Sequence, residues 1–310
     1  IDWMALNGVT MPLAITGQES IWYKVWTDMG LSDEQVRSYF TGPAHLPWHR
    51  MSNVDYWQSP LPQSWLKDQE ELQKRILERE REFDMTPVLP AFAGHVPAEL
   101  KTIYPNAKIY QMSQWGGFDE KYRSHFIDPM DSLYSIIQRR FLEEQTKVYG
   151  TNHIYGIDPF NEVDSPDWSE DFLANVSSKI YESIHQVDSA AQWLQMTWMF
   201  FYDKKKWTPP RIRSFLKRSK NPIFLPFLFF DICIFQLDCE IDHFLLRHLA
   251  GNHGFYIVSH RSCQLILISV ICPDKFVKAS ILCNPALFVL DQPVQHKFQI
   301  RDQPVLINQV

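Results

Sequence analysis

The stretch Thr151-Asn-His-Ile-Tyr-Gly-Ile-Asp-Pro-Phe-Asn-Glu162 decides the fold class of this chain. Its apolar part, His153–Asp158, predicts a short buried strand that runs into a polar loop. Helical patterns with apolar stripes lie on both sides of it, at about 131–149 and 169–187, and a second strand is expected at 192–200. Strands and helices therefore alternate along the chain, which is typical of a parallel α/β sheet.

The same alternation extends toward both ends of the front part. We expect two further strands, at 8–15 and 86–92, and helices near 18–29, 64–83 and 209–217. No glycine-rich phosphate loop of the dinucleotide or P-loop type follows any of these strands. This absence disfavours a nucleotide-binding fold and favours an incomplete TIM-like (β/α)8 barrel, in which active sites lie on the loops after the strand ends.

The bulk composition excludes several classes of function. With 45% apolar and 21% charged residues, the 310-residue chain has ordinary globular composition. With a net charge of −6, the chain lacks the excess of basic residues that is typical of nucleic-acid-binding proteins. The longest apolar run, at 223–235, is too short and too interrupted to span a membrane, so we expect no membrane span. The chain begins at Ile1 without a leader or an initiator Met, so we expect it to be a fragment of a longer protein.

A break in composition near residue 220 divides the chain into two expected domains, 1–220 and an atypical apolar tail, 221–310. All 11 Trp and all 9 Met precede the break, and all 5 Cys follow it. The tail is either a second domain of different ancestry or sequence that did not evolve as protein, such as a translated intron. Apolar strings without a clear period favour the second interpretation. The cysteines are irregularly spaced and odd in number, so they indicate neither a disulfide framework nor a zinc site.

The chemistry is expected just past the strand that ends at Asp158. Glu162 is placed there as the carboxylic acid that glycoside hydrolysis needs to protonate a leaving sugar oxygen, and Asn161 can hydrogen-bond a sugar substituent. The competing interpretation is an exposed loop pair. Three tryptophans, Trp48, Trp57 and Trp115, lie in loops rather than on helix faces, which favours a sugar-binding role for them more than for Trp22, because apolar sugar faces lie flat on aromatic rings. For Trp198, at the end of an apolar strand, a pocket and the core both remain open.

Several gap-free segments resemble the α-N-acetylglucosaminidases, glycoside hydrolase family 89, and keep the order of that family across roughly residues 2–215. The matching segments are Asp2-Trp-Met-Ala-Leu-Asn-Gly8, Gly17-Gln-Glu-Ser-Ile-Trp22, Phe40-Thr-Gly-Pro-Ala44, Thr86-Pro-Val-Leu-Pro-Ala-Phe-Ala-Gly-His-Val-Pro97, His153-Ile-Tyr-Gly156 and Phe160-Asn-Glu162.

This resemblance implies a retaining exo-glycosidase with a TIM-like barrel that removes terminal α-linked N-acetylglucosamine from glycans, as from heparan sulfate. It implies that Glu162 is the acid/base and that the substrate-binding residues are Asn161, Trp48, Met51, Trp115 and Trp198. It also implies that no metal or organic cofactor takes part. For the full-length family it implies a homo-oligomer and a lysosomal, vacuolar or secreted location.

The departures from the family pattern concern activity. The first barrel strand of the family precedes residue 1, and the segment that carries the nucleophilic glutamate has no match here. Glu240 is the only glutamate after residue 220, and nothing in the sequence places it beside Glu162. We therefore expect this chain alone to be inactive. The alternative from another class is a non-catalytic glycan-binding module, which would keep the tryptophans without a nucleophile.

Overall fold

The computed structural model describes residues 1–217, 223–225, 266–268, 277–283, 286–292 and 299–301. The chain divides into two compact units, one formed by residues 13–224 and the other by residues 1–12 with 225–310. The division at 224/225 falls near the expected boundary at 220, whereas residues 1–12 group with the second unit. Glu240, the cysteines other than Cys283 and most of the apolar run at 223–235 lie outside the described residues.

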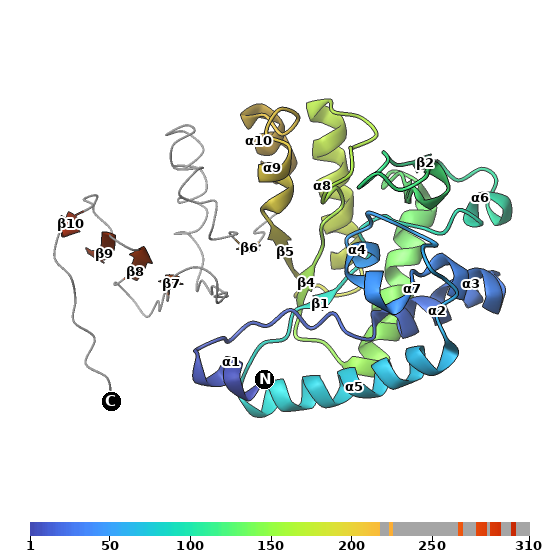
Figure 1. Cartoon of the computed structure of the whole chain (residues 1–310). Coiled ribbons are helices and arrows are strands. Elements are labelled where there is room, and N and C mark those ends of the chain that lie inside the picture. Colours follow the sequence, from blue (N-terminus) through green and yellow to red (C-terminus); the bar gives the residue numbers. More distant parts are fainter. Residues whose placement is uncertain (218–222, 226–265, 269–276, 284–285, 293–298, 302–310) are drawn as a thin grey trace. The chain divides into compact units, whose positions relative to one another are not determined.

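The larger unit contains the alternating strands and helices that the sequence predicts (Figure 1). Its central sheet has the strand order β1-β4-β5-β6, and the members are β1 (Leu89–Pro90), β4 (Ile154–Gly156), β5 (Gln192–Met196) and β6 (Ile223–Leu225). The pairs β1/β4 and β4/β5 are parallel, with Tyr155 opposite Leu89 on one side and Trp193 on the other. An isolated parallel bridge between Leu13 and Val88 precedes β1 in this sheet.

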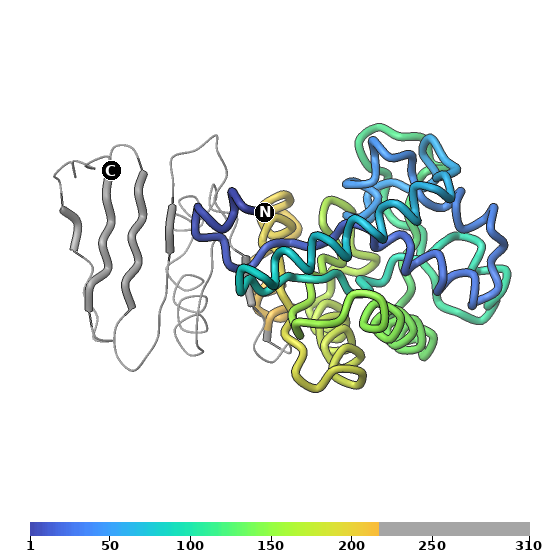
Figure 2. Tube along the Cα trace, turned by 90° about the horizontal axis from the view of Figure 1, so that it is seen from below, coloured from blue at the N-terminus to red at the C-terminus, as the bar shows by residue number. Residues whose placement is uncertain are grey.

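Helices occupy the connections between these strands. They are α2 (Gln18–Asp28), α3 (Asp33–Tyr39), η1 (Pro43–His45), α4 (Leu46–Arg50), α5 (Gln63–Glu82), α6 (Leu100–Ile103), η2 (Glu120–Tyr122), α7 (Ser132–Tyr149), α8 (Glu170–His185), α9 (Trp198–Tyr202) and α10 (Pro209–Lys217). Helices α2, α7, α8 and α10 pack side by side in that order, which is also the order of the strands that they follow. Figures 1 and 2 show this curved layer of helices, which with the parallel strands forms part of a TIM-barrel wall.

Aromatic stacking and buried glutamines join the helices to the sheet. The ring of Trp22 on α2 stacks on Phe141 of α7, with centroids 3.9 Å apart, and also contacts Trp26 at 5.0 Å. Two glutamines of α7 bind the backbone of β1 and of the residues that follow it. The Gln145 amide donates to Pro90 O at 2.9 Å, and the Gln138 amide bonds both the N–H and the C=O of Phe92, two residues after the strand. Buried backbone groups need such partners where a strand is too short to pair them.

Three details differ from the sequence-based expectation. The strand expected at 8–15 contributes a single bridge at Leu13. The strand expected at 192–200 ends at Met196 and gives way to α9, because the Met196 N–H bonds the side chain of Asp158 and the chain turns away from the sheet there. An antiparallel pair, β2 (Ile109–Gln111) and β3 (His125–Ile127), stands between β1 and α7 and was not predicted.

The second unit contains α1 (Asp2–Leu6) and an antiparallel sheet in the order β10-β9-β8-β7. Its strands are β7 (Ile266–Ile268), β8 (Val277–Cys283), β9 (Ala286–Gln292) and β10 (Gln299–Arg301). Across the part of the chain that the structure describes, no helix combines the length and the apolar character that crossing a membrane requires.

Candidate active site

The polar loop that follows β4 is fixed from two sides. The indole Nε1 of Trp193 on β5 donates to Ile157 O at 2.9 Å, and His95, which follows β1, contacts Pro159 O through Nε2 at 2.9 Å. Since a carbonyl oxygen only accepts, Nε2 must carry the proton of the His95 ring. Burial lowers the pKa of His95 to about 4, so the ring is neutral at physiological pH. The segment from Ile157 onward is therefore held at the carboxyl end of the sheet.

Glu162 is half-buried in this loop and accepts a hydrogen bond on each carboxylate oxygen. Trp115 Nε1 donates to Oε2 at 2.8 Å, and Trp198 Nε1 donates to Oε1 at 2.7 Å. The two indoles come from different segments, the loop between β2 and β3 and the first residue of α9. The structure thus brings together three residues that the sequence singled out from three loops.

The loop that contains α4 supplies the other two residues expected from the family resemblance. Trp48 lies on α4, its side chain is 38% exposed, and its ring centroid lies 6.3 Å from that of Trp115. Met51 follows α4 and is half-buried. The amide of Asn53, oriented so that both its atoms are satisfied, donates to Met51 O at 3.0 Å. Its oxygen lies 3.3 Å from Trp115 Nε1 and so shares the indole N–H with Glu162, the nearer acceptor at 2.8 Å. This amide connects the Trp48–Met51 loop to the surroundings of Glu162.

Asn161, the remaining expected contact, precedes Glu162 and is 3% exposed. Its Oδ1 atom has no hydrogen-bond partner within the described part of the chain. A buried amide oxygen without a partner is costly, so such an atom is a candidate for receiving a hydrogen bond from a ligand.

Asp158, which the sequence placed only as the end of a strand, is a second carboxyl group in this region. It accepts a hydrogen bond from the Met196 N–H at 3.1 Å and another from the Gln195 side chain. Burial raises the pKa of Asp158 to about 7, and these two hydrogen bonds oppose the shift only in part. The carboxyl group thus fixes the turn that leads from β5 into α9 and Trp198.

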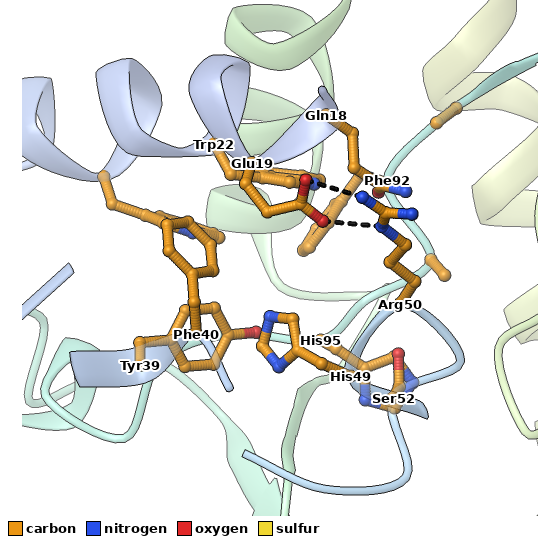
Figure 3. A pocket seen from close by; sticks show the side chains of 13 residues that line it. Gln18, Glu19, Trp22, Tyr39, Phe40, His49, Arg50, Ser52, Phe92 and His95 are labelled. Carbon is orange, nitrogen blue, oxygen red and sulfur yellow. Dashed lines mark hydrogen bonds and ion pairs between the residues drawn. The ribbon is translucent and has the colours of Figure 1, made fainter. Parts of the chain in front are cut away.

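A buried ion pair that sequence reasoning did not identify joins the Trp48–Met51 segment to α2. Arg50 Nε and Nη2 donate to the two carboxylate oxygens of Glu19 at 2.7 and 2.9 Å, and both residues line a cavity of about 60 Å³ (Figure 3). Ligand pockets are usually roughly 300–1,000 Å³, so this cavity is too small for a sugar. Glu19 appeared in the sequence only as a residue of a first helical turn, and no spacing rule pairs it with Arg50, which lies 31 residues away.

Within the described residues, no group of three or more His, Cys, Asp or Glu side chains is arranged to hold a metal ion. At the carboxyl end of the strands, Glu162 is the carboxyl group that is held by two indole N–H groups, and the Asp158 carboxyl is bound to backbone and side-chain groups of the β5–α9 turn. The half-buried Glu162 carboxyl accepts from Trp115, whose ring neighbours the partly exposed Trp48, so it is placed to exchange a proton with a ligand bound there.

Comparison with known proteins agrees with this architecture. The family model described as the alpha-N-acetylglucosaminidase (NAGLU) tim-barrel domain matches residues 1–225. Human alpha-N-acetylglucosaminidase is 44% identical over 217 residues, a match that covers 70% of this chain and 29% of the human protein. The chain therefore spans less than a third of the length of that relative.

Two solved structures of the family 89 glycoside hydrolase from Clostridium perfringens superpose on the chain, each with 26% sequence identity, covering 73% of this chain and 25% of theirs. The complex with 2-acetamido-1,2-dideoxynojirmycin gives a TM-score of 0.63. A variant with two Glu→Gln substitutions, in complex with its substrate GlcNAc-alpha-1,4-galactose, gives 0.64.

These matches define the chain as part of a glycoside hydrolase barrel of the family 89 type. More specifically, the chain belongs to the α-N-acetylglucosaminidase family.

Proposed function

We propose that residues 13–217 are the part of an α-N-acetylglucosaminidase barrel that supplies the general acid, and that Glu162 is this acid. The supporting observation is the position of Glu162 at the carboxyl end of β4, where its carboxyl group is held by two indole N–H groups beside the partly exposed Trp48. In TIM-barrel enzymes the reacting groups lie at this end of the strands.

In the proposed reaction, the Glu162 carboxyl gives its proton to the glycosidic oxygen as the bond from that oxygen to the sugar breaks. A second carboxylate attacks the anomeric carbon, and water later releases the sugar while Glu162 takes a proton back. The substrate class is a glycan that ends in α-linked N-acetylglucosamine, with heparan sulfate as the expected natural example. Asn161, Trp48 and Met51 are proposed substrate contacts. A lysosomal, vacuolar or secreted location and a homo-oligomeric state of the complete protein belong to the same proposal.

A retaining mechanism needs the second carboxyl at roughly 5 Å from the first. We propose that this nucleophile lies outside residues 1–217, on a later barrel strand of the complete protein, so that this chain alone does not hydrolyse its substrate. The domain proposal is correspondingly a partial catalytic barrel at 1–220 followed by an unrelated tail at 221–310.

The test replaces the glutamate of the complete human relative at the position aligned with Glu162 by glutamine. Cleavage of GlcNAc-α-1,4-galactose should fall by at least about 100-fold, since general acid catalysis contributes roughly 100-fold to 10,000-fold. Aryl glycosides with good leaving groups need little protonation, so formation of the glycosyl-enzyme from them should suffer less. Near-wild-type rates on both substrates would refute the assignment. Sugar binding with no acid-dependent cleavage would favour the glycan-binding module.

A further inference from the structure

The two tryptophans that bond Glu162 are half-buried and pack against other aromatic rings. The ring of Phe118 lies nearly parallel to that of Trp115, at 16° with centroids 5.7 Å apart, and so takes one face of the indole. Trp48 also contacts the Trp115 ring, at an angle of 40°. Sugar stacking requires an open aromatic face, whereas Trp115 presents its N–H edge to the carboxylate.

The surroundings of both indoles hold this orientation. Phe118 is itself fixed by edge contacts with Trp57 and Tyr122, at 4.9 and 6.3 Å between centroids. On α9, the ring of Trp198 packs against Phe201 and Tyr202, one helical turn further on, at 5.6 and 6.1 Å. Each indole therefore belongs to a small aromatic cluster that limits rotation of its ring.

We propose that Trp115 and Trp198 are positioning residues for the acid/base, which act through their indole N–H groups rather than as stacking platforms for the sugar. This inference rests on the proposed role of Glu162. When Glu162 gives its proton to the leaving oxygen it becomes a carboxylate, and the two N–H groups then donate to its two oxygens. Hydrogen bonds to an ionised carboxylate are stronger than those to its neutral form. The pair thus fixes the Glu162 side chain and stabilises the state in which it must act as the base for the second half of the reaction.

The first test uses this chain and does not depend on activity. In a nitrogen-15 NMR spectrum of its 11 indole N–H groups, Glu162→Gln should shift the Trp115 and Trp198 signals, which Trp115→Phe and Trp198→Phe identify. Trp65 provides the matched control, because its Nε1 has no partner among the described residues. Trp115 and Trp198 signals that do not respond to the Glu162 substitution would overturn the proposal.

The second test separates positioning from stacking in the complete human relative. Benzothienylalanine, which keeps the shape of tryptophan but lacks the N–H, replaces the residues aligned with Trp115 and Trp198. We expect kcat on GlcNAc-α-1,4-galactose to fall about 10-fold to 100-fold, with little change in the Kd of 2-acetamido-1,2-dideoxynojirmycin. A weaker Kd at unchanged kcat would overturn the inference in favour of stacking.

The outcomes also separate this inference from the proposed function. If the glutamine variant at the Glu162 position is crippled while both isosteric variants remain fully active, the acid assignment stands and the positioning role is wrong. If that glutamine variant keeps full activity, the proposed function itself fails, whatever the NMR spectrum shows.

Discussion

Arg50 and Glu19 form a bidentate ion pair in the interior of the barrel segment, and the Glu19 side chain is 2% exposed. The pair joins the first turn of α2 to the end of α4, and α4 carries Trp48 (Figure 3). Replacing one partner leaves the other as an uncompensated buried charge. Glu19→Gln should therefore lower the free energy of unfolding by about 3–5 kcal/mol.

Urea denaturation of the chain measures this effect, and the exposed pair Lys179–Glu182 on α8 provides the matched control. Glu182→Gln should change the free energy of unfolding by no more than about 0.5 kcal/mol, because surface ion pairs contribute little. If Glu19→Gln and Glu182→Gln gave equally small changes, the buried pair would not be what holds α4 against α2.

The buried carboxyl of Asp158 should make stability fall as the pH rises. Burial raises its pKa to about 7 from 3.8, so between about pH 4 and 7 the folded chain holds a proton that the unfolded chain has released. The unfolded state binds fewer protons in this window, so the free energy of unfolding decreases toward pH 7 and levels off above it. Asp158→Asn removes this titration. The free energy of unfolding of the variant minus that of the wild type should therefore increase by about 2–4 kcal/mol from pH 4 to pH 7.5. Urea midpoints at the two pH values test this, and an equal difference at both would contradict it.

Sequence patterns predicted the elements better than their ends. The long helices α5, α7 and α8 begin and end within two residues of their expected limits, because their apolar stripes and flanking residues are local signals. The strands are shorter than expected, since β1 and β5 end where side chains from elsewhere, Gln138 and Asp158, take over the backbone hydrogen bonds. Contacts of this kind depend on tertiary packing and leave no periodic trace in the sequence.

The candidate site shows the same division between local and long-range signals. Glu162 could be placed from its strand end and Trp115 from its position in a loop, whereas Trp48, which was expected in a loop, lies on the short helix α4. The direction of each ring could not, because it depends on residues such as Phe118 and on a carboxylate 47 residues away from Trp115. Trp198 was expected at the end of a strand and instead begins a helix, which is what turns its indole N–H toward Glu162.

His95 should make the barrel segment less stable in acid. Burial lowers the pKa of its ring to about 4, against 6.5 in the unfolded chain, so between those values only the unfolded state takes up the proton. Stability therefore falls as the pH drops from about 6.5 to 4, by about 3 kcal/mol for this group. His95→Gln keeps a donor for Pro159 O but cannot titrate. The stability of this variant minus that of the wild type should therefore be larger at pH 4.5 than at pH 7.5. Melting curves at the two pH values measure this gain.

A second buried histidine tests how much of the loss of stability in acid is due to His95. His125 is also buried, and burial lowers its pKa to about 4, so His125→Gln should remove a separate part of the acid sensitivity. The gains of the two variants should add in the double variant if each ring titrates on its own. A His95→Gln variant that lost the same stability at both pH values would show that the ring contributes only its hydrogen bond.

Trp48 is the most exposed of the three tryptophans of this site, at 38%, so its ring is the best placed to receive a sugar. Removing a stacked indole should weaken a sugar-shaped inhibitor by about 1 kcal/mol, or roughly fivefold in Kd, with little loss of stability because the ring is not core. In the complete human relative, alanine at the position aligned with Trp48 should therefore raise the Kd of 2-acetamido-1,2-dideoxynojirmycin while the melting temperature stays nearly constant. Ile136→Ala, on the outer helix α7 and 37% exposed, is the matched control and should leave the Kd unchanged. If the inhibitor bound both variants equally well, the sugar would have to contact another face of the barrel.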